Sequence, residues 1–371
     1  MITLRFIFTR IFQIYALLPL LTFRKIVNLV NAFFLFLIRY PKSVKTPPII
    51  VLSITNRCNF KCIMCSLQSQ NPNPLIDDNN PEDFNFEILE KFLREHYKLI
   101  SLIRIHGGEP LYHKKIIPLI DLLNELKIAF NIITNGSLLT KEISEKLVNN
   151  YCIGVGFSLD ATKQDIYEQI RVNGKIDAVT ENLMELNRIK KKQKSYRPVL
   201  TASMCVLSIN AKEMTNLVKY CHTHSIRSLS VVEADDLNTG LIKSNEFISS
   251  NKELAHSEIK KAAKEAKKLR IVFRTRFPSL DNEKYKDIQY HKGRIKPRNC
   301  INFYLVAWLL PNLNLIGCSV VKAPFGNLTQ NKFEEIWNSE KFGYYQARID
   351  FKNRITPKVC EGCIYTGSFY S

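Results

Sequence analysis

Six apolar stretches rich in β-branched residues recur between residues 48 and 235, and an amphipathic helical pattern separates each from the next. Alternation of strand and helix at this rhythm predicts parallel strands joined by crossover helices. Polar residues gather just after the strand ends, the end at which α/β barrels place their active sites. The predicted strands lie near residues 49–54, 101–106, 128–133, 153–158, 199–206 and 227–233.

The first 45 residues carry a different pattern, with two apolar runs at residues 11–23 and 26–38 separated by Arg24 and Lys25. Each run is shorter than the ~20 residues that one helix needs to cross a bilayer. No Asp or Glu occurs in residues 1–76. We therefore interpret this arm as two helices that lie on an anionic membrane surface. Helices packed on the barrel or on a partner, and a spanning or cleaved segment, are the alternatives.

A length of 371 residues is enough for a barrel and an accessory module. The net charge of +19 is concentrated, beyond the arm, in residues 188–197 and 252–298. Lysine-rich helical runs are usually solvated faces, and no nucleic-acid-binding motif accompanies them, so we expect no nucleic-acid partner. We divide the chain into a helical arm, a barrel, a basic helical linker and a cysteine-rich C-terminal region, at residues 1–45, 46–235, 236–299 and 300–371.

Three cysteines follow the first predicted strand with the spacing C-x3-C-x2-C, at Cys58, Cys62 and Cys65. Soft thiolates select iron-sulfur clusters, and three thiolates leave the fourth iron of a cube open to a substrate or cofactor. A tetrahedral zinc site would need a fourth ligand nearby, and no Cys or His follows in the same loop. Zinc ligands or core thiols remain the alternative reading of these three residues.

This spacing and the motifs that follow resemble the radical S-adenosylmethionine (SAM) superfamily. Gly107, Gly108 and Glu109, which precede Pro110, follow the second predicted strand and look like the GGEP motif of that family. The resemblance implies that they hold the amino group of SAM, because glycines let the backbone approach a ligand and a carboxylate suits an ammonium.

Further polar residues follow the next two strands. The resemblance implies that they bind the ribose and methionine parts of SAM and that an arginine lies near the SAM carboxylate, at Thr134, Asn135, Ser158, Asp160 and Arg171. Thr134, Asn135 and Asp160 could equally be turn or N-cap residues.

The C-terminal region adds the pair Cys360 and Cys363 and the more distant Cys300 and Cys318. Four such thiolates can complete one metal site. The stretches 316–318, 325–328 and 333–338 are similar to the SPASM domain of many radical SAM enzymes. That similarity implies one fully ligated auxiliary 4Fe-4S cluster for electron transfer, with a structural zinc site as the alternative.

The remaining cysteines, Cys152, Cys205 and Cys221, fall on strand or helix patterns and are interpreted as core thiols. Ten cysteines in a metal-binding chain indicate a reducing compartment, and we expect a cytoplasmic protein, peripheral on the inner face of the membrane.

The resemblance also implies a fold and an activity. The fold is α/β: a partial (β/α)6 TIM-like barrel of the radical SAM type, with a small cysteine-rich C-terminal α+β domain and the N-terminal apolar helical arm. The activity is reductive cleavage of SAM at the 4Fe-4S cluster to a 5'-deoxyadenosyl radical, which abstracts hydrogen from substrate in oxidoreductase-type or related chemistry. A flavodoxin or ferredoxin-type protein would supply the electron.

The substrate is a separate question. We expect a small-molecule or lipid-linked substrate, because the arm resembles no peptide-recognition domain. A peptide or protein side-chain maturase of the same family is the alternative. A non-catalytic iron-sulfur electron carrier is the alternative from another class.

Overall fold

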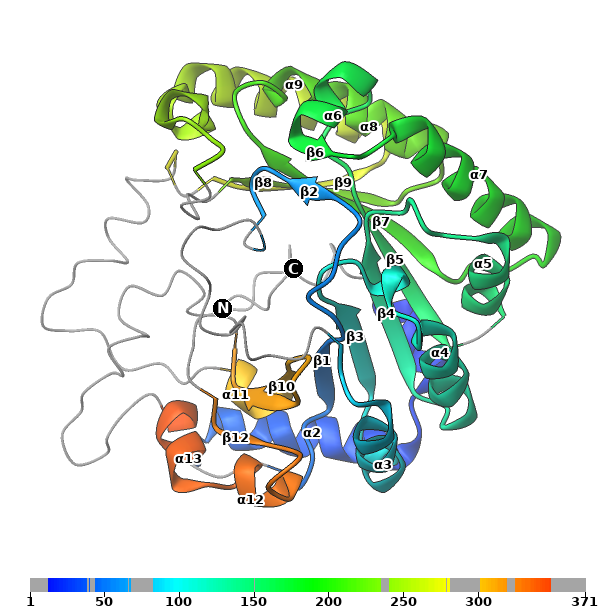
Figure 1. Cartoon of the computed structure of the whole chain (residues 1–371), viewed down its shortest axis with the longest axis vertical. Coiled ribbons are helices and arrows are strands. Elements are labelled where there is room, and N and C mark those ends of the chain that lie inside the picture. Colours follow the sequence, from blue (N-terminus) through cyan, green and yellow to red (C-terminus); the bar gives the residue numbers. More distant parts are fainter. Residues whose placement is uncertain are drawn as a thin grey trace, which may run out of the picture.

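The computed structural model describes residues 13–38, 40, 44–65, 67, 83–149, 151–234, 240–277, 279–280, 301–318 and 324–347. Over these ranges the chain forms an arc-shaped sheet whose outer side is covered by helices (Figure 1). The strand order in the sheet is β12-β11-β10-β1-β3-β4-β5-β7-β8-β9.

The six predicted strands are present, parallel and adjacent in chain order, which confirms the α/β partial barrel. In each strand one set of alternate residues faces the helices, and the other set faces the hollow side of the sheet, here called the lumen. In β3, for example, Ile103 and Ile105 are fully buried in the helix-side core, so Arg104 and His106 face the lumen. The strands are β1 (Ile49–Ser53), β3 (Leu102–His106), β4 (Ala129–Thr134), β5 (Cys152–Ser158), β7 (Val199–Val206) and β8 (Ser228–Glu233).

Two further parallel strands extend this set. β9 (Val272–Arg276) pairs with β8, and β10 (Val306–Leu309) pairs with β1. β11 (Asn314–Ile316) and β12 (Gly326–Asn327) then continue the sheet in antiparallel fashion. The sequence did not predict β9, which lies in the segment assigned to a basic helical linker, because basic residues at alternate positions hide its strand character. β10 places the C-terminal region on the barrel's own sheet.

Helices after the strands cover the outer face, and local capping explains where several begin. The side chains of Asn85, Thr140 and Asn251 accept hydrogen bonds from backbone N–H groups three residues later, as N-caps do. The helices are α3 (Phe86–His96), α4 (Ile116–Glu125), α5 (Lys141–Val148), α6 (Gln164–Ile170), α7 (Ile176–Lys192), α8 (Met214–Thr223) and α9 (Lys252–Leu269). Short 3-10 helices are η3 (Pro110–Tyr112), η4 (Ala211–Glu213), η5 (Ser244–Glu246) and η6 (Ile248–Ser250).

In the C-terminal region, α11 (Asn302–Leu305), α12 (Phe333–Trp337) and α13 (Glu340–Ala347) pack near β10 to β12 (Figure 1). Trp337 is almost fully buried, and its indole N–H donates to the backbone oxygen of Val44 at 2.9 Å. The rings of Trp337 and Phe342 lie 4.4 Å apart, centroid to centroid. An aromatic core thus attaches this region to the start of the barrel.

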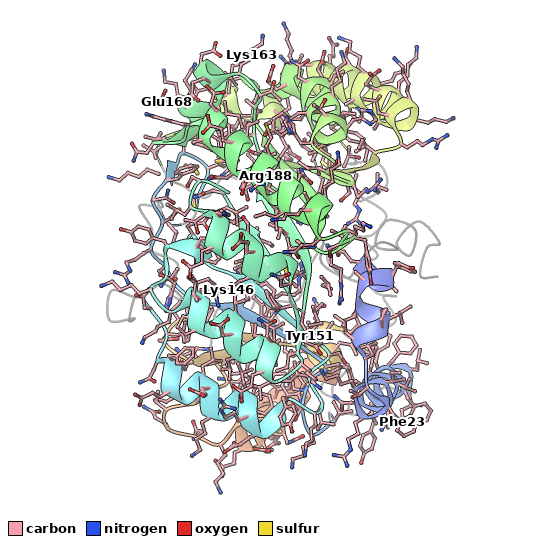
Figure 2. All side chains as sticks on the ribbon, turned by 90° about the vertical axis from the view of Figure 1, so that its right-hand side faces the viewer. Phe23, Lys146, Tyr151, Lys163, Glu168 and Arg188 are labelled. Atoms are coloured by element: carbon pink, nitrogen blue, oxygen red, sulfur yellow. The ribbon has the colours of Figure 1, made fainter. Side chains whose placement is uncertain are left out.

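The N-terminal arm closes the barrel at the N-terminal ends of its strands. Residues 13–17 are helical, followed by η1 (Leu18–Leu20) and α2 (Phe23–Leu37). Ala16 packs with residues near the starts of β4, β5 and β7, and Ala32 packs with Val51 and Leu305. Figure 2 shows the arm along one edge of the molecule. Among the described residues, every helix is too short or too polar to cross a membrane.

Candidate active site

The predicted cysteines lie on the loop that leaves the C-terminal end of β1. Cys58, Cys62 and Cys65 line one cavity of about 250 Å³. β2 (Lys61–Cys62) is part of this loop and pairs with β6 (Arg171–Val172), so that Cys62 lies opposite Arg171. A backbone bond from Cys65 N–H to the oxygen of Cys62, 3.1 Å long, tightens the turn between the second and third thiol. The same cavity is lined by Phe60, Met64, Leu67, His106, Gly107, Gly108, Glu109, Ile133, Thr134, Asn135, Ser158 and Arg171.

The arrangement of the thiols suits a polynuclear cluster. In the part of the chain that the structure describes, no three His, Cys, Asp or Glu side chains are grouped as ligands of one metal ion. Three thiolates that each hold a different iron share a cavity without converging on one point. Burial raises the pKa of Cys58, and it raises that of Cys62 to about 12, while the nearby Arg171 guanidinium opposes both shifts. Loss of these thiol protons is therefore coupled to metal binding.

The two glycines of the predicted GGEP motif serve the cysteine loop as well as the cavity. Gly108 N–H donates to Thr55 O at 2.7 Å, and Glu109 N–H donates to Arg57 O at 2.8 Å. A Cβ atom on Gly107, whose φ is +140°, would lie 2.5 Å from Thr55 O, and one on Gly108 would lie 2.1 Å from Arg57 O. The close approach that these glycines permit is thus to the backbone of the cysteine loop, which the sequence did not indicate.

Glu109 joins the ends of β3 and β4. Its Oε1 atom accepts hydrogen bonds from Thr134 Oγ1 at 2.7 Å and from Leu111 N–H at 3.0 Å, and its Oε2 atom accepts from Asn135 N–H at 2.6 Å. The side chain is almost fully buried. Burial raises the pKa of Glu109, and the three donors oppose that rise. Each of these N–H and O–H donors needs an oxygen lone pair as its acceptor. Together they favour the ionised carboxylate of Glu109 over the protonated acid at the wall of the cavity.

Thr134 and Asn135 also hold the loop after β4. Thr134 Oγ1 accepts from Gly136 N–H at 2.9 Å, and Asn135 Oδ1 accepts from Ser137 N–H at 2.9 Å. Asn135 also donates to Asn59 Oδ1 at 2.9 Å, which connects this loop to the cysteine loop. The turn role considered for both residues is therefore present, and both line the cavity in addition.

Arg171 and Asp160 occupy different positions relative to the cavity. Arg171 lines it, and its Nη1 atom lies 3.6 Å from Cys62 Sγ. Asp160 has no exposed surface, does not line the cavity, and accepts from Cys205 N–H at 2.7 Å. Asp160 lies behind the Arg171 guanidinium and does not reach the cavity, and its contact with a cofactor stays a prediction. Burial alone would lower the pKa of Arg171, but the Asp160 carboxylate, Cys62 and Tyr167 together outweigh it and raise the pKa, which keeps the guanidinium charged.

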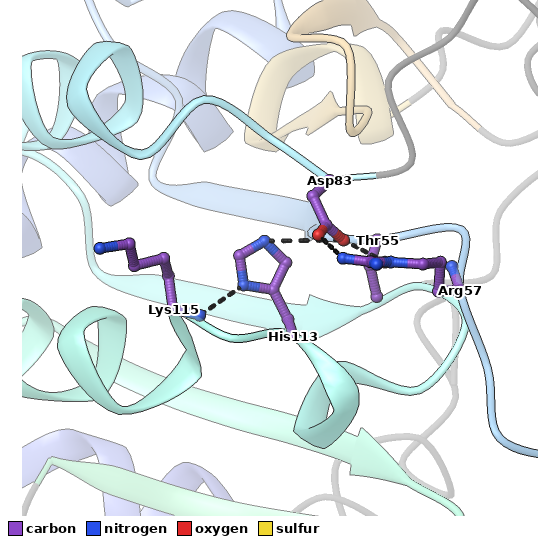
Figure 3. Close-up of polar contacts among 5 residues, drawn as sticks. All are labelled: Thr55, Arg57, Asp83, His113 and Lys115. Carbon is purple, nitrogen blue, oxygen red and sulfur yellow. Dashed lines mark hydrogen bonds and ion pairs between the residues drawn. The ribbon is translucent and has the colours of Figure 1, made fainter.

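A polar cluster that the sequence did not reveal braces the base of the cysteine loop (Figure 3). Asp83 forms an ion pair with Arg57 and accepts a hydrogen bond from Thr55 Oγ1 at 2.7 Å. His113 Nε2 lies 3.9 Å from the same carboxylate, and His113 Nδ1 accepts from Lys115 N–H at 2.9 Å. Asp83 thus connects the loop after β1 to the loop that follows Glu109. No spacing rule links residue 83 to these partners, because the contact depends on the folded path of the chain.

Of the predicted auxiliary ligands, Cys318 is described and buried, just after β11. Cys300, Cys360 and Cys363 lie outside the described residues. Among the predicted core thiols, Cys152 and Cys221 are fully buried, as expected. Cys205 is partly exposed, on the set of β7 residues that alternates with buried Met204 and Val206.

Comparison with protein families identifies both parts of the chain. Residues 52–221 match the model of the radical SAM superfamily, and residues 305–364 match that of the SPASM iron-sulfur cluster-binding domain. The first match begins within β1 and contains the cysteine loop, the loop after β3 and Arg171. The two families imply 4Fe-4S clusters and SAM as cofactors, and the thiol-lined cavity fits that implication.

Curated relatives have several names. The chain is 27% identical over 171 residues to a probable GTP 3',8-cyclase of Methanocaldococcus jannaschii, which covers 46% of this chain and 53% of that protein. It is 23% identical over 330 residues to a tungsten-containing aldehyde ferredoxin oxidoreductase cofactor-modifying protein of Pyrococcus furiosus, covering 84% and 86%. The chain thus spans about half the length of the first relative and most of the second.

Solved structures share the fold. SuiB of Streptococcus suis superposes with a TM-score of 0.62 at 18% identity, over 81% of this chain and 68% of that one, and a complex of SuiB with its precursor peptide SuiA gives the same score. The protein anSMEcpe with bound AdoMet superposes with a TM-score of 0.57 at 16% identity, over 86% of this chain and 87% of that one.

Proposed function

We propose, from the premise that this chain belongs to the radical SAM superfamily and carries a SPASM domain, that it cleaves SAM reductively and abstracts hydrogen from a small-molecule or lipid-linked substrate. The cavity that brings three thiols together with Glu109, Thr134, Asn135 and Arg171 is the observation that carries the proposal. A pure electron carrier would need the thiols but has no use for a carboxylate and hydrogen-bonding loops on the same wall. The cavity therefore favours the enzyme over the carrier.

The residues around the cavity have distinct proposed roles. Cys58, Cys62 and Cys65 hold a 4Fe-4S cluster, and Arg171 offsets the negative charge near Cys62. When bound, the cluster supplies one electron and an open iron at which SAM is cleaved to methionine and a 5'-deoxyadenosyl radical. Glu109 attracts the SAM ammonium, and its hydrogen bonds to the loop after β4 keep Thr134 and Asn135 in place for the rest of the cofactor.

The lumen beside this cavity contains two cationic side chains. Arg104 on β3 faces the lumen, and so does Arg274 on β9, since its neighbour Phe273 packs on the helix-side core. Burial lowers the pKa of both arginines, which remain cationic because the guanidinium pKa is so high. The first candidate substrate remains a small molecule or a lipid-linked molecule.

A peptide maturase is the second candidate. It is supported by the peptide complex of SuiB, which superposes over most of this chain.

An auxiliary cluster that includes Cys318 would accept electrons if the net reaction is an oxidation. The net charge of +19 suits an acidic flavodoxin or ferredoxin-type donor, and ten cysteines in a metal-binding chain suit a reducing, cytoplasmic location.

Anaerobic reconstitution followed by dithionite and SAM tests the proposal. We expect 5'-deoxyadenosine from the native protein and none from the Cys62→Ala variant. Cys152→Ala is the matched control, because Cys152 is a fully buried thiol that does not line the cavity. A native protein with a reducible cluster that never yields 5'-deoxyadenosine would identify an electron carrier instead.

A further inference from the structure

α2 turns two of its polar residues toward the barrel and several large apolar residues toward solvent. Lys25 and Asn28 are buried, with 2% and 6% of their surface exposed, and both face the protein. Lys25 Nζ donates to Lys127 O at 2.7 Å. Asn28 Nδ2 donates to Thr46 O at 2.9 Å and to Leu99 O at 3.0 Å. Lys25 and Asn28 thus hold α2 against the barrel.

The opposite side of α2 presents large apolar residues to solvent. Phe23, Val30, Phe34 and Leu37 are 80%, 58%, 55% and 58% exposed. At 100° per residue these four positions fall on one side of the helix, opposite Lys25 and Ala32. We call this side, which also includes Ile26, Val27 and Ile38, the outer face of α2. A contiguous apolar surface of this kind marks an interaction site.

The surroundings of the outer face are basic. A groove of about 370 Å³ runs beside it, with apolar walls that include Phe23, Val27 and Leu99. Arg24 and Lys45 line the same groove, and both are exposed. None of the residues that line this groove is acidic. An apolar surface bordered by cations suits a partner that is apolar inside and anionic at its boundary.

We propose that the outer face of α2 docks on an anionic phospholipid bilayer, with the helix parallel to the membrane and Arg24 and Lys45 at the lipid phosphates. The helix has 15 residues and a length of about 22 Å, short of the ~30 Å of a bilayer core. Its buried Lys25 and Asn28 keep it attached to the barrel. A second copy of the chain is a poorer partner, because each copy has a net charge of +19 and like charges repel.

Docking through α2 also sets the direction of the cavity. The arm covers the N-terminal ends of the strands, whereas the thiol-lined cavity lies at their C-terminal ends. Figure 2 shows Phe23 at one edge of the molecule and Glu168, on the helix before β6, at the opposite edge. The cavity then faces away from the bilayer, which favours a small-molecule substrate from the aqueous side over a lipid-linked one. This second step, unlike the docking itself, rests on the proposed function of the cavity.

Vesicle co-sedimentation tests the docking with the full chain and without SAM. We expect the native protein to bind vesicles with phosphatidylglycerol and to bind phosphatidylcholine vesicles much less. Val30→Glu with Phe34→Glu removes two exposed apolar anchors and should weaken binding about tenfold or more. Met184→Glu is the matched control, because Met184 is a 56% exposed apolar residue on α7 and is not part of the outer face of α2. Arg24→Glu with Lys45→Glu should weaken binding at low salt.

Several results would overturn the docking. The native protein could stay in the supernatant, or it could bind neutral vesicles equally well. The Val30→Glu, Phe34→Glu double variant could also sediment like the native protein. A double variant with half the native mass by light scattering would show that a second copy covers the face. Unchanged iron content and 5'-deoxyadenosine formation in the variants would show that they fold, so that failure of docking and failure of the proposed function remain separate.

Paired tryptophan probes test the orientation. Phe34→Trp lies on the outer face of α2, and Tyr112→Trp lies beyond Glu109 at the cavity end, where Tyr112 is 47% exposed. Brominated lipids in the vesicles should quench the first probe and spare the second. Quenching of the Tyr112→Trp probe would refute the orientation while leaving membrane binding in place.

Discussion

Asp160 and Arg171 form a buried ion pair, with 2.7 Å between Asp160 Oδ2 and Arg171 Nε. The pair connects the end of β5 to β6, and β6 carries the Arg171 guanidinium to Cys62. Because Asp160 is fully buried, it acts on the cavity through Arg171 and not by direct contact. We therefore infer that Asp160 positions Arg171.

Asp160→Asn should destabilise the protein by about 3–5 kcal/mol, because it leaves a buried guanidinium without its counter-ion. Denaturant unfolding of anaerobically purified protein measures this cost. Arg171→Gln in the same chain should recover part of it, since the double variant buries no unpaired charge. Equal and additive costs for the two substitutions would show that the pair is not coupled.

Gly108→Ala should disturb the cysteine loop, because its Cβ atom would lie 2.1 Å from Arg57 O, a backbone atom that cannot rotate away. We expect loss of iron from the first cluster and at least a tenfold fall in 5'-deoxyadenosine formation. Gly156→Ala is the control, since its Cβ would meet Thr201 Oγ1 at an ordinary 3.4 Å. Native iron content in Gly108→Ala would contradict this account of the glycine.

Glu109→Gln should weaken SAM binding, because the amide loses the negative charge and one of its two ends cannot accept the hydrogen bonds that reach Glu109. We expect an increase of about tenfold or more in the Kd for SAM, measured by equilibrium binding to reconstituted protein. Glu213→Gln is the matched control. Glu213 is a buried carboxylate that accepts bonds from Thr162 and Asn216 and does not line the cavity. Equal loss of affinity in both variants would point to general destabilisation.

The sequence predicted those features that depend on local pattern. The six central strands followed from runs such as the one in β1, and Cys58, Cys62 and Cys65 followed from spacing within one loop. Both are properties of contiguous residues. The resemblance to a known family then placed Gly107 to Glu109 on the same wall.

Features that depend on packing between distant segments were missed. Asp83 braces the cysteine loop from 26 residues away in sequence. The burial of Asp160 behind Arg171 depends on β2 pairing with β6. The orientation of α2 was also not predictable, because both sides of that helix are largely apolar, and only contacts with Lys127, Thr46 and Leu99 decide which side faces the barrel.

The protein should lose stability as the pH falls from 8 to 6, in part because of His113. Burial lowers the pKa of His113 to about 4, and the nearby Arg57 and Lys115 add to that shift, so the folded chain keeps this ring neutral. Unfolded, the ring takes up a proton below its usual pKa of about 6.5, and stability therefore falls as the pH drops below that value. For a folded pKa near 4, the contribution of this one ring at pH 6 is at most about 0.8 kcal/mol.

His113→Asn can still accept a hydrogen bond from Lys115 N–H and does not titrate, so its unfolding free energy should change less between pH 8 and pH 6 than that of the native protein. Denaturant titrations at both pH values measure the difference, and an equal change in the two proteins would show that His113 already titrates normally in the folded chain.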